Sequence, residues 1–399
     1  MKFLFIILII LGIICKNTIN KIDNHLIYFD LTNLPKTTII KLSDLGVIDI
    51  DYIPLETNER SFISGNFDLT SMGSRIVAGN DFYIIKHFNT IKKFRDDGSF
   101  VVTIGRVGRG PDEFLTAHDI DVCSKTQEIY IADGWQKKFY VYSDKGDFVR
   151  SFAGPVNTSV FRITPDGILC YSTNVTANIK YSYNLIDTNG KITKEITNKY
   201  PWNLNSKYGA FVFEENIFYE YKNQLFKKEI YSDTVYAYNN GSFKPHLVFA
   251  HGKRLLTTQA RTDLDPMELM ENYISQQNIF EFGDYVYYEF LFNRHKYTFI
   301  GSKKRNFKAL MINELDMSSK RFKGFVNDID GGPSLLPYTV KNENTLVCIA
   351  DAFIMKNYIT SQEFKDTAPK YPKKKQELES LVNSLKEDDN AVLILIKIK

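Results

Sequence analysis

A glycine-rich segment with two arginines, IGRVGRGPDEF at residues 104–114, is the first place where residue types and spacing could do chemistry. Its glycines lack the G-x-G-x-x-G spacing of a dinucleotide site, and no phosphate-loop lysine follows them. Glycine and Pro111 favour a turn between two elements. The guanidinium groups of Arg106 and Arg109 can hold a carboxylate or sulfate bidentately. We therefore predict a turn whose arginines are candidate binding residues for an acidic glycan or peptide.

An aromatic residue and several acids supply further candidates. In IADGWQKKFYVY, Asp133 and Trp135 stand at the end of a predicted strand. An exposed Trp135 could stack on a sugar, and burial of its ring in the core is the alternative. In AHDID, His118 lies beside Asp119 and Asp121, as a catalytic base or as a satisfied surface group. We name Asp133 and Trp135 as ligand-binding candidates and no residue as catalytic.

One further segment has the residue types of a cation site. In NDIDGGP, Asn327, Asp328 and Asp330 resemble the start of a calcium loop, whose ligands are spaced two residues apart. The later carboxylate of such a loop is missing, and Asn, Asp and Gly are also common turn residues. Calcium and a solvated turn are both open, and we expect no other cofactor.

The search for established chemistry is otherwise negative. The chain has no H-E-x-x-H zinc helix and no G-x-S-x-G nucleophile segment. Carboxylates are plentiful, so a two-carboxylate glycosidase stays open, but no pair can be chosen from the sequence. Fifty basic and 47 acidic residues give a formal charge of +3, which excludes nucleic acid as an expected partner.

The amino terminus predicts export. One lysine precedes an apolar run at residues 3–14, which is shorter than the roughly 20 residues of a membrane-spanning helix. Cys15 follows this run and is a candidate lipid anchor, although Ile14 replaces the small residue that lipoproteins have there. Lipidation and plain cleavage are both open. We expect a leader and linker over residues 1–24 and a periplasmic, outer-membrane or cell-surface protein.

A repeated turn reveals the architecture. FRDDGSF, YSDKGDF, IDTNGKI and YNNGSF align on glycines that are 48, 44 and 51 residues apart. The aligned glycines are Gly98, Gly146, Gly190 and Gly241. Asp or Asn before glycine is typical of a tight turn between antiparallel strands. Because upstream strands such as DFYIIK and EIYIAD recur at the same period, each unit has the size of one four-stranded propeller blade.

The remaining strands complete a ring. DYVYYEFLF at 284–292, KYTFI at 296–300, NTLVCIADAFI at 344–354 and AVLILIKI near the carboxyl end fit further blades. We therefore predict an all-β, six-bladed β-propeller of four-stranded antiparallel blades over residues 25–399, closed by pairing of VIDIDYIPL with residues 391–398.

Two short helical insertions interrupt this pattern. Around residues 264–277, Asp265 is a candidate helix cap, followed by Pro266 and Glu268. Around residues 373–387, apolar residues recur at helical spacing. We expect both helices to pack on the propeller, with a docking surface for a partner as the alternative.

Several motifs together resemble a known family. Their order along the chain is similar to that of the six-bladed β-propellers of bacterial exported proteins and lipoproteins, which are related to NHL-repeat propellers. The motifs are IPLETNE (53–59), IGRVGRGPDEF (104–114), EIYIAD (128–133), YSDTVYAY (231–238), NDIDGGP (327–333) and DDNAVLILIKIK (388–399). The resemblance implies the fold and an envelope location, and it supplies no catalytic residues.

Two functional hypotheses follow. The first is a monomeric, non-enzymatic propeller that binds or scaffolds a glycan, peptide or envelope protein. The second is a secreted propeller hydrolase or lyase that acts on polysaccharide. Carboxylates or histidines gathered at the channel mouth would favour the enzyme, and a shallow face lined by aromatic residues and arginine would favour binding.

Overall fold

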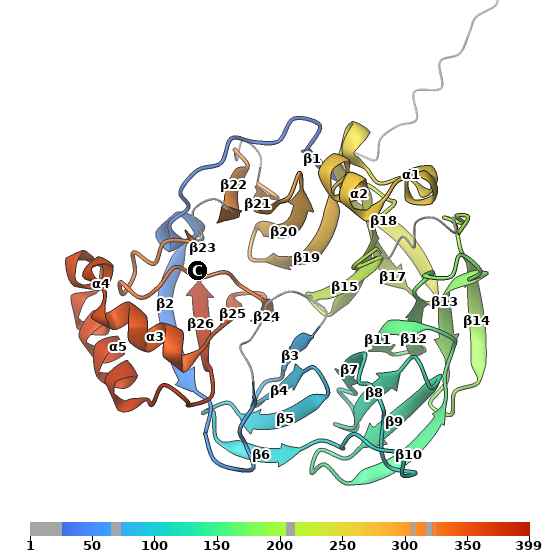
Figure 1. Cartoon of the computed structure of the whole chain (residues 1–399), viewed down its shortest axis with the longest axis horizontal. Coiled ribbons are helices and arrows are strands. Elements are labelled where there is room, and N and C mark those ends of the chain that lie inside the picture. The colour runs from blue at the N-terminus through green and yellow to red at the C-terminus, as the bar shows by residue number, and fades with distance from the viewer. Residues whose placement is uncertain (1–25, 65–72, 205–211, 305–307, 317–320, 323) are drawn as a thin grey trace, which may run out of the picture.

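Six antiparallel sheets are arranged as blades around a central axis in the computed structural model (Figure 1). The structure describes residues 26–64, 73–204, 212–304, 308–316, 321–322 and 324–399. The first blade contains β3 (Ser74–Ala78), β4 (Phe82–His87), β5 (Thr90–Arg95) and β6 (Phe100–Thr103), and the second contains β7 (Asp119–Val122), β8 (Ile129–Asp133), β9 (Lys138–Tyr142) and β10 (Phe148–Ala153). The third contains β11 (Thr158–Thr164), β12 (Gly167–Ser172), β13 (Tyr181–Ile186) and β14 (Ile192–Thr197). The predicted six-bladed propeller is confirmed.

The other three blades vary this plan. The fourth contains β15 (Asn216–Tyr221), β16 (Gln224–Glu229), β17 (Thr234–Asn239) and β18 (Ser242–Ala250), and β1 (Ile27–Asp30) adds a fifth strand parallel to β18. The fifth contains β19 (Ser275–Phe282), β20 (Tyr285–Phe292), β21 (His295–Ser302), β22 (Leu310–Asp316) and β23 (Arg321–Phe322). The sixth contains β24 (Thr339–Asn342), β25 (Thr345–Ala350), β26 (Val392–Ile398) and β2 (Val47–Pro54). The parallel strand β1 has no counterpart in the sequence prediction.

The two ends of the chain close the ring within the sixth blade. The outer strand β2 pairs antiparallel with β26, from Val47 opposite Ile398 to Pro54 opposite Val392, as predicted (Figure 1). The pairing joins segments more than 300 residues apart, so the ring forms only when both segments are in place. Closure leaves no unpaired edge between the first and last parts of the chain.

Middle strands are buried along nearly their whole length because each blade lies between two others. All of β8 and nearly all of β4 is buried, including Lys86, whereas most of the outer strand β14 is exposed. Phe114 lies between the first two blades, in a cluster with Ile84 of β4 and Ile131 of β8. Its position agrees with the expected role of the segment 104–114, which links outer strand β6 to inner strand β7.

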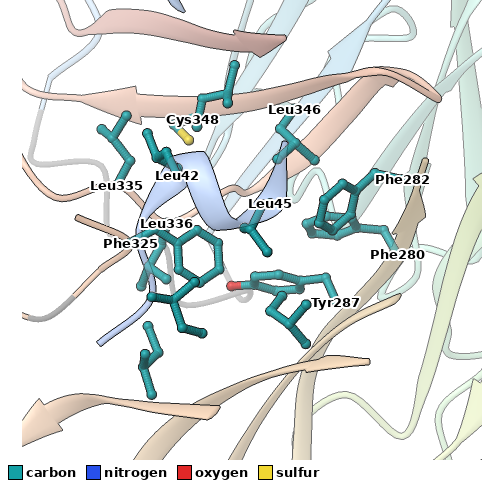
Figure 2. Packing of buried hydrophobic residues seen from close by; sticks show 14 of the residues in the cluster. Leu42, Leu45, Phe280, Phe282, Tyr287, Phe325, Leu335, Leu336, Leu346 and Cys348 are labelled. Atoms are coloured by element: carbon teal, nitrogen blue, oxygen red, sulfur yellow. The ribbon is translucent and has the colours of Figure 1, made fainter. Parts of the chain in front are cut away.

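The largest cluster joins the fourth, fifth and sixth blades. Figure 2 shows Leu42 and Leu45, from the short helix η1 (Leu42–Leu45), against Tyr287 and Leu346. Gly46 ends this helix with a left-handed backbone, and β2 begins at the next residue. The apolar residues of η1 therefore fix the entry of the closing strand.

The repeated glycines have a second role besides the turn. All four have positive φ angles, between 70° and 87°. A Cβ atom at Gly98 would overlap the carbonyl oxygen of Pro54, at the end of the outer strand of the preceding blade. Gly190 has the same relation to the Ala153 carbonyl at the end of β10. At these two positions the glycine thus lets neighbouring blades approach closely, in addition to forming the turn.

Besides η1, the described helices are inserted in two connections. Between β18 and β19 lie η2 (Gly252–Arg254), α1 (Thr258–Asp263) and α2 (Pro266–Asn272). The predicted cap is confirmed, because the Asp265 carboxylate accepts hydrogen bonds from the amides of Met267 and Glu268. The helix is shorter than the predicted range 264–277, since β19 begins at Ser275.

The other helices lie beside the sixth blade, between β25 and β26 (Figure 1). They are α3 (Ala352–Thr360), α4 (Gln362–Asp366) and α5 (Pro372–Ser384), the last of which corresponds to the predicted helix at 373–387. The predicted strand at 344–354 is wrong after Ala350, because α3 begins at Ala352 and buries Met355 and Ile359 at helical spacing. In the described part of the chain, every helix is too short or too polar to cross a membrane.

Replacing a repeat glycine should destabilise the ring through the contact between blades. We expect Gly190→Ala to lower the free energy of unfolding by about 2 to 4 kcal/mol, because it adds a clash with Ala153 to the strain of positive φ. Gly46→Ala is the matched control, since Gly46 has φ 78° and no atom within 4 Å of the added Cβ. Urea unfolding measures both variants, and equal losses of stability would contradict the role in blade packing.

Candidate functional site

The face that carries the loops before the inner strands contains a pocket of about 470 Å³, called here the mouth pocket. Its rim comes from the β4–β5 turn, the β8–β9 turn, the β12–β13 loop and the segments that precede β7, β11 and β15. Phe88, Trp135 and Phe213 present their rings at this rim, with 63%, 71% and 41% of their surface exposed. Val160 and Val175 add aliphatic surface. The pocket is therefore mainly apolar and aromatic.

A polar cavity of about 270 Å³ continues from the mouth pocket along the channel. All six inner strands contribute to its wall. The two cavities share five lining residues, and the shared set is Lys86, His118, Val160, Glu214 and Asn216. A ligand in the mouth pocket can therefore reach polar groups inside the channel.

Two arginines hold one carboxylate inside the channel. Asp119 of β7 pairs with Arg75 of β3 at 3.2 Å and with Arg162 of β11 at 2.9 Å. Its oxygens also accept backbone hydrogen bonds from Phe161 and Ile120. Asp119 is thereby fully engaged, and it joins the inner strands of three blades.

A second acid lies deeper in the same strand. Burial raises the pKa of Asp121 to about 6, although Arg162 and Arg75 favour its charged form. Its carboxylate accepts a hydrogen bond of 2.8 Å from the amide of Ile163. Asp121 can therefore exchange a proton near neutral pH.

The junction of the two cavities contains a lysine and a histidine. Lys86 is 3% exposed, and its Nζ donates a hydrogen bond of 3.3 Å to the carbonyl of Gly73. Burial lowers the pKa of Lys86 to about 8. His118 accepts a hydrogen bond from the amide of Gly134 at Nδ1, and its ring centroid lies 5.6 Å from that of Trp135. Burial also lowers the pKa of His118.

A buried network supports the rim from behind. Arg261 of α1 is completely buried and pairs with Glu215 at 2.7 Å, immediately before β15. It also donates to the Tyr231 hydroxyl, and its guanidinium lies 4.1 Å from the ring centroid of Trp202. Glu215 accepts a further hydrogen bond from the amide of Asn174. The helical insertion therefore fixes two rim segments of the mouth pocket.

The structure separates the predicted arginines from this pocket. Arg106 pairs with Glu113 of its own loop at 2.6 Å and lies 3.9 Å from Asp112. Arg109 is exposed on the same loop. Neither arginine lines the mouth pocket or the channel, so the ligand-binding role of this loop stays a prediction.

The structure exposes one of the other two predicted binding residues and buries the second. Trp135 lies at the rim, exposed as the sugar-stacking hypothesis requires. Asp133 is completely buried and accepts hydrogen bonds from the amides of Leu115, Thr116 and Gln136. Asp133 thus fixes the loop before β7 and the turn that carries Trp135, and its contact with a ligand stays a prediction.

The candidate calcium loop is held by hydrogen bonds within the loop and with Tyr52 and Ser43. The Asn327 side chain donates to Asp330, which also accepts from the Tyr52 hydroxyl and the Gly332 amide. Asp328 accepts two hydrogen bonds from Ser43. Within the described ranges, no three His, Cys, Asp or Glu residues are grouped to hold a metal. Cys15, the candidate lipid anchor, lies outside the described residues.

The sequence analysis did not identify two basic residues that line the channel cavity. Lys86 stands in the apolar strand FYIIKH, and Arg162 stands in TSVFRIT. A basic residue inside an otherwise apolar strand is the signal that could have identified them, because a buried charge requires a partner or a function.

The fold and the mouth pocket together define a six-bladed β-propeller with a ligand-sized cavity at its channel mouth. The chain belongs to the family described as "Domain of unknown function (DUF4934)", whose model matches residues 26–397.

The solved structures that are similar to this chain include two from Bacteroides species. A Bacteroides fragilis NCTC 9343 protein with the name "Putative exported protein" has 17% identity and a TM-score of 0.69, over 94% of this chain and 99% of that protein. A DUF4221 member from Bacteroides vulgatus ATCC 8482 has 11% identity and a TM-score of 0.48, over 88% and 97% of the two chains. Among the curated proteins, none matches the chain. The first of these likenesses supports the propeller fold.

The two tryptophans should differ in accessibility. Trp135 is 71% exposed, whereas Trp202 is buried and donates a hydrogen bond of 2.8 Å to the Asn174 carbonyl. We expect iodide to quench the fluorescence of Trp202→Phe strongly and that of Trp135→Phe weakly. Equal quenching of the two variants would contradict the placement of Trp135 at the open rim.

Proposed function

We propose that this chain is an exported binding propeller, which holds an organic ligand in the mouth pocket without converting it. The exposed ring of Trp135 above a mainly apolar pocket carries the proposal. A cavity of this size, with an apolar wall and a few polar groups, is typical of small-ligand sites. Flat aromatic rings stack on sugar rings or on apolar side chains, so a glycan or a peptide fits the rim.

The rigidity of the rim supports binding. Asp133 holds the turn that precedes Trp135, and the buried pair of Arg261 with Glu215 holds the segment before β15. A rim that is already ordered loses little conformational entropy when a ligand binds. The network behind the pocket therefore favours recognition by a preformed surface.

A hydrolase or lyase is the second candidate function. Asp121 supports it, because a carboxyl with a pKa of about 6 can serve as a general acid or base. Asp119 argues against it, since two arginines and two backbone amides already engage this carboxylate. We favour binding because the aromatic residues lie at the open rim, whereas Asp119 and Asp121 line only the channel cavity.

The location outside the cytoplasm rests on different support. The apolar run at residues 3–14 is typical of an export signal, and the Bacteroides fragilis protein of the same fold is named as exported. A lipid on Cys15 would keep the propeller at a membrane surface through a single chain and linker. The segment 104–114 supports a relation to NHL-repeat propellers.

An array of glycans and peptides tests the proposed function on the chain that lacks residues 1–24, with analysis of products on every hit. We expect intact ligands and an affinity about tenfold lower for Trp135→Ala, because loss of one stacked ring costs about 1.4 kcal/mol. Phe353→Ala is the control, since Phe353 is an exposed aromatic residue on α3, outside the pocket. A shortened or unsaturated product would favour the hydrolase or lyase instead.

A further inference from the structure

We propose that the ligand of the mouth pocket is an anionic amphiphile, whose acidic group binds Lys86 at the junction with the channel and whose apolar body lies against Trp135. The inference rests on the proposed function, since it names the chemical class of ligand for the same pocket. The mouth pocket is mainly apolar, whereas the channel cavity is polar, and the buried Lys86 lies where the two meet.

Lys86 has little compensation for its charge. Within the described residues, the Gly73 carbonyl is the one hydrogen-bond acceptor of its ammonium group, and no carboxylate oxygen lies within 4.0 Å. An ammonium group has three donors, so the hydrogen-bonding capacity of Lys86 is largely unused. A buried ammonium group without a counter-ion is costly, which makes Lys86 a binding site for an anion.

The charged residues next to Lys86 do not provide it with a free counter-ion. Lys86 stands directly opposite Arg75 in the pairing of β4 with β3, and like charges in opposite positions destabilise a sheet. Asp119 is the acid whose charge favours the ammonium form of Lys86, but its oxygens already pair with Arg75 and Arg162. An acidic ligand would supply the missing counter-charge.

Other titratable groups also line the two cavities near Lys86. His118 and Glu214 line both cavities, and Glu220 lines the channel further along β15. Burial lowers the pKa of His118, so its ring is neutral above pH 7. Asp121 titrates near pH 6. Between pH 7 and 9.5, Lys86 is therefore the titrating group that the junction offers to an anion.

The apolar wall determines the rest of the ligand. Phe88, Trp135 and Val175 line the mouth pocket and Lys86 lies at its inner end, so a ring or an aliphatic chain can cover the wall while its acid reaches the ammonium group. A neutral sugar would leave Lys86 uncompensated, and a cationic peptide would add repulsion. The chemistry favours an acid with an apolar body, such as a carboxylate on an aromatic or aliphatic chain.

Two fluorescent probes with the same rings test this inference. 1-Anilinonaphthalene-8-sulfonate has a sulfonate that N-phenyl-1-naphthylamine lacks. On the chain without residues 1–24, we expect the sulfonate probe to bind about tenfold more tightly, since a charged hydrogen bond contributes about 1.4 kcal/mol or more. Lys86→Met should remove this preference and leave the affinity for the neutral probe within about twofold, while Trp135→Ala should weaken both probes.

A pH titration of the unmodified protein gives an independent measurement if Lys86→Met fails to fold. Lys86 is charged below its pKa of about 8 and neutral above it, and a bound anion favours the charged form. The affinity for the sulfonate probe should therefore fall between pH 7 and 9.5, whereas that for the neutral probe stays constant.

The outcomes separate the two proposals. Binding of both probes that depends on Trp135, with no preference for the sulfonate and no change with pH, would overturn the acidic ligand and leave the mouth pocket as a binding site. Binding that is unaffected by Trp135→Ala would overturn the mouth pocket itself as the site, and with it the proposed function.

Discussion

The close approach of neighbouring blades is the constraint on which the rest of the structure depends. Gly98 and Gly190 allow this approach, because their hairpins lie against carbonyl groups at the end of the preceding outer strand, where a side chain would clash. Pairing of β2 with β26 then holds the ring closed. Since the inner strands are held at fixed positions around the axis, Asp119 can pair with arginines from both adjacent blades. The contact between blades thus fixes the channel as well as the core.

The mouth pocket uses this rigid frame and adds loops to it. The turn that carries Trp135 is held by the buried Asp133, and the segment before β15 is held by Arg261 of the helical insertion. A buried ion pair of this kind contributes little net stability, but removing one partner costs about 3 to 5 kcal/mol because the other charge is left unpaired. We therefore attribute the network to the placement of the rim segments rather than to a gain in the stability of the fold.

Sequence periodicity was sufficient to predict the propeller because the turn glycine and the strands before it recur at the length of one blade. The repeated turns, the closure of the ring and the cap at Asp265 were all predictable from local patterns. The helix α3 was not, since an apolar segment after a buried strand is compatible with either element. Of the site, Trp135 was predicted, but Lys86 and Arg162 were not, because only the fold brings their strands, which are more than 70 residues apart, to the wall of one cavity. The sequence also does not show that backbone amides engage the carboxylate of Asp133.

A crystal structure of the protein with bound 1-anilinonaphthalene-8-sulfonate would test the central claim directly, since it locates the rings and the acidic group separately. Our account predicts the rings in the mouth pocket against Trp135, with a sulfonate oxygen within hydrogen-bonding distance of Lys86 Nζ. Rings bound elsewhere, for example on the exposed Phe353 of α3, or a sulfonate that points away from the channel, would contradict the account.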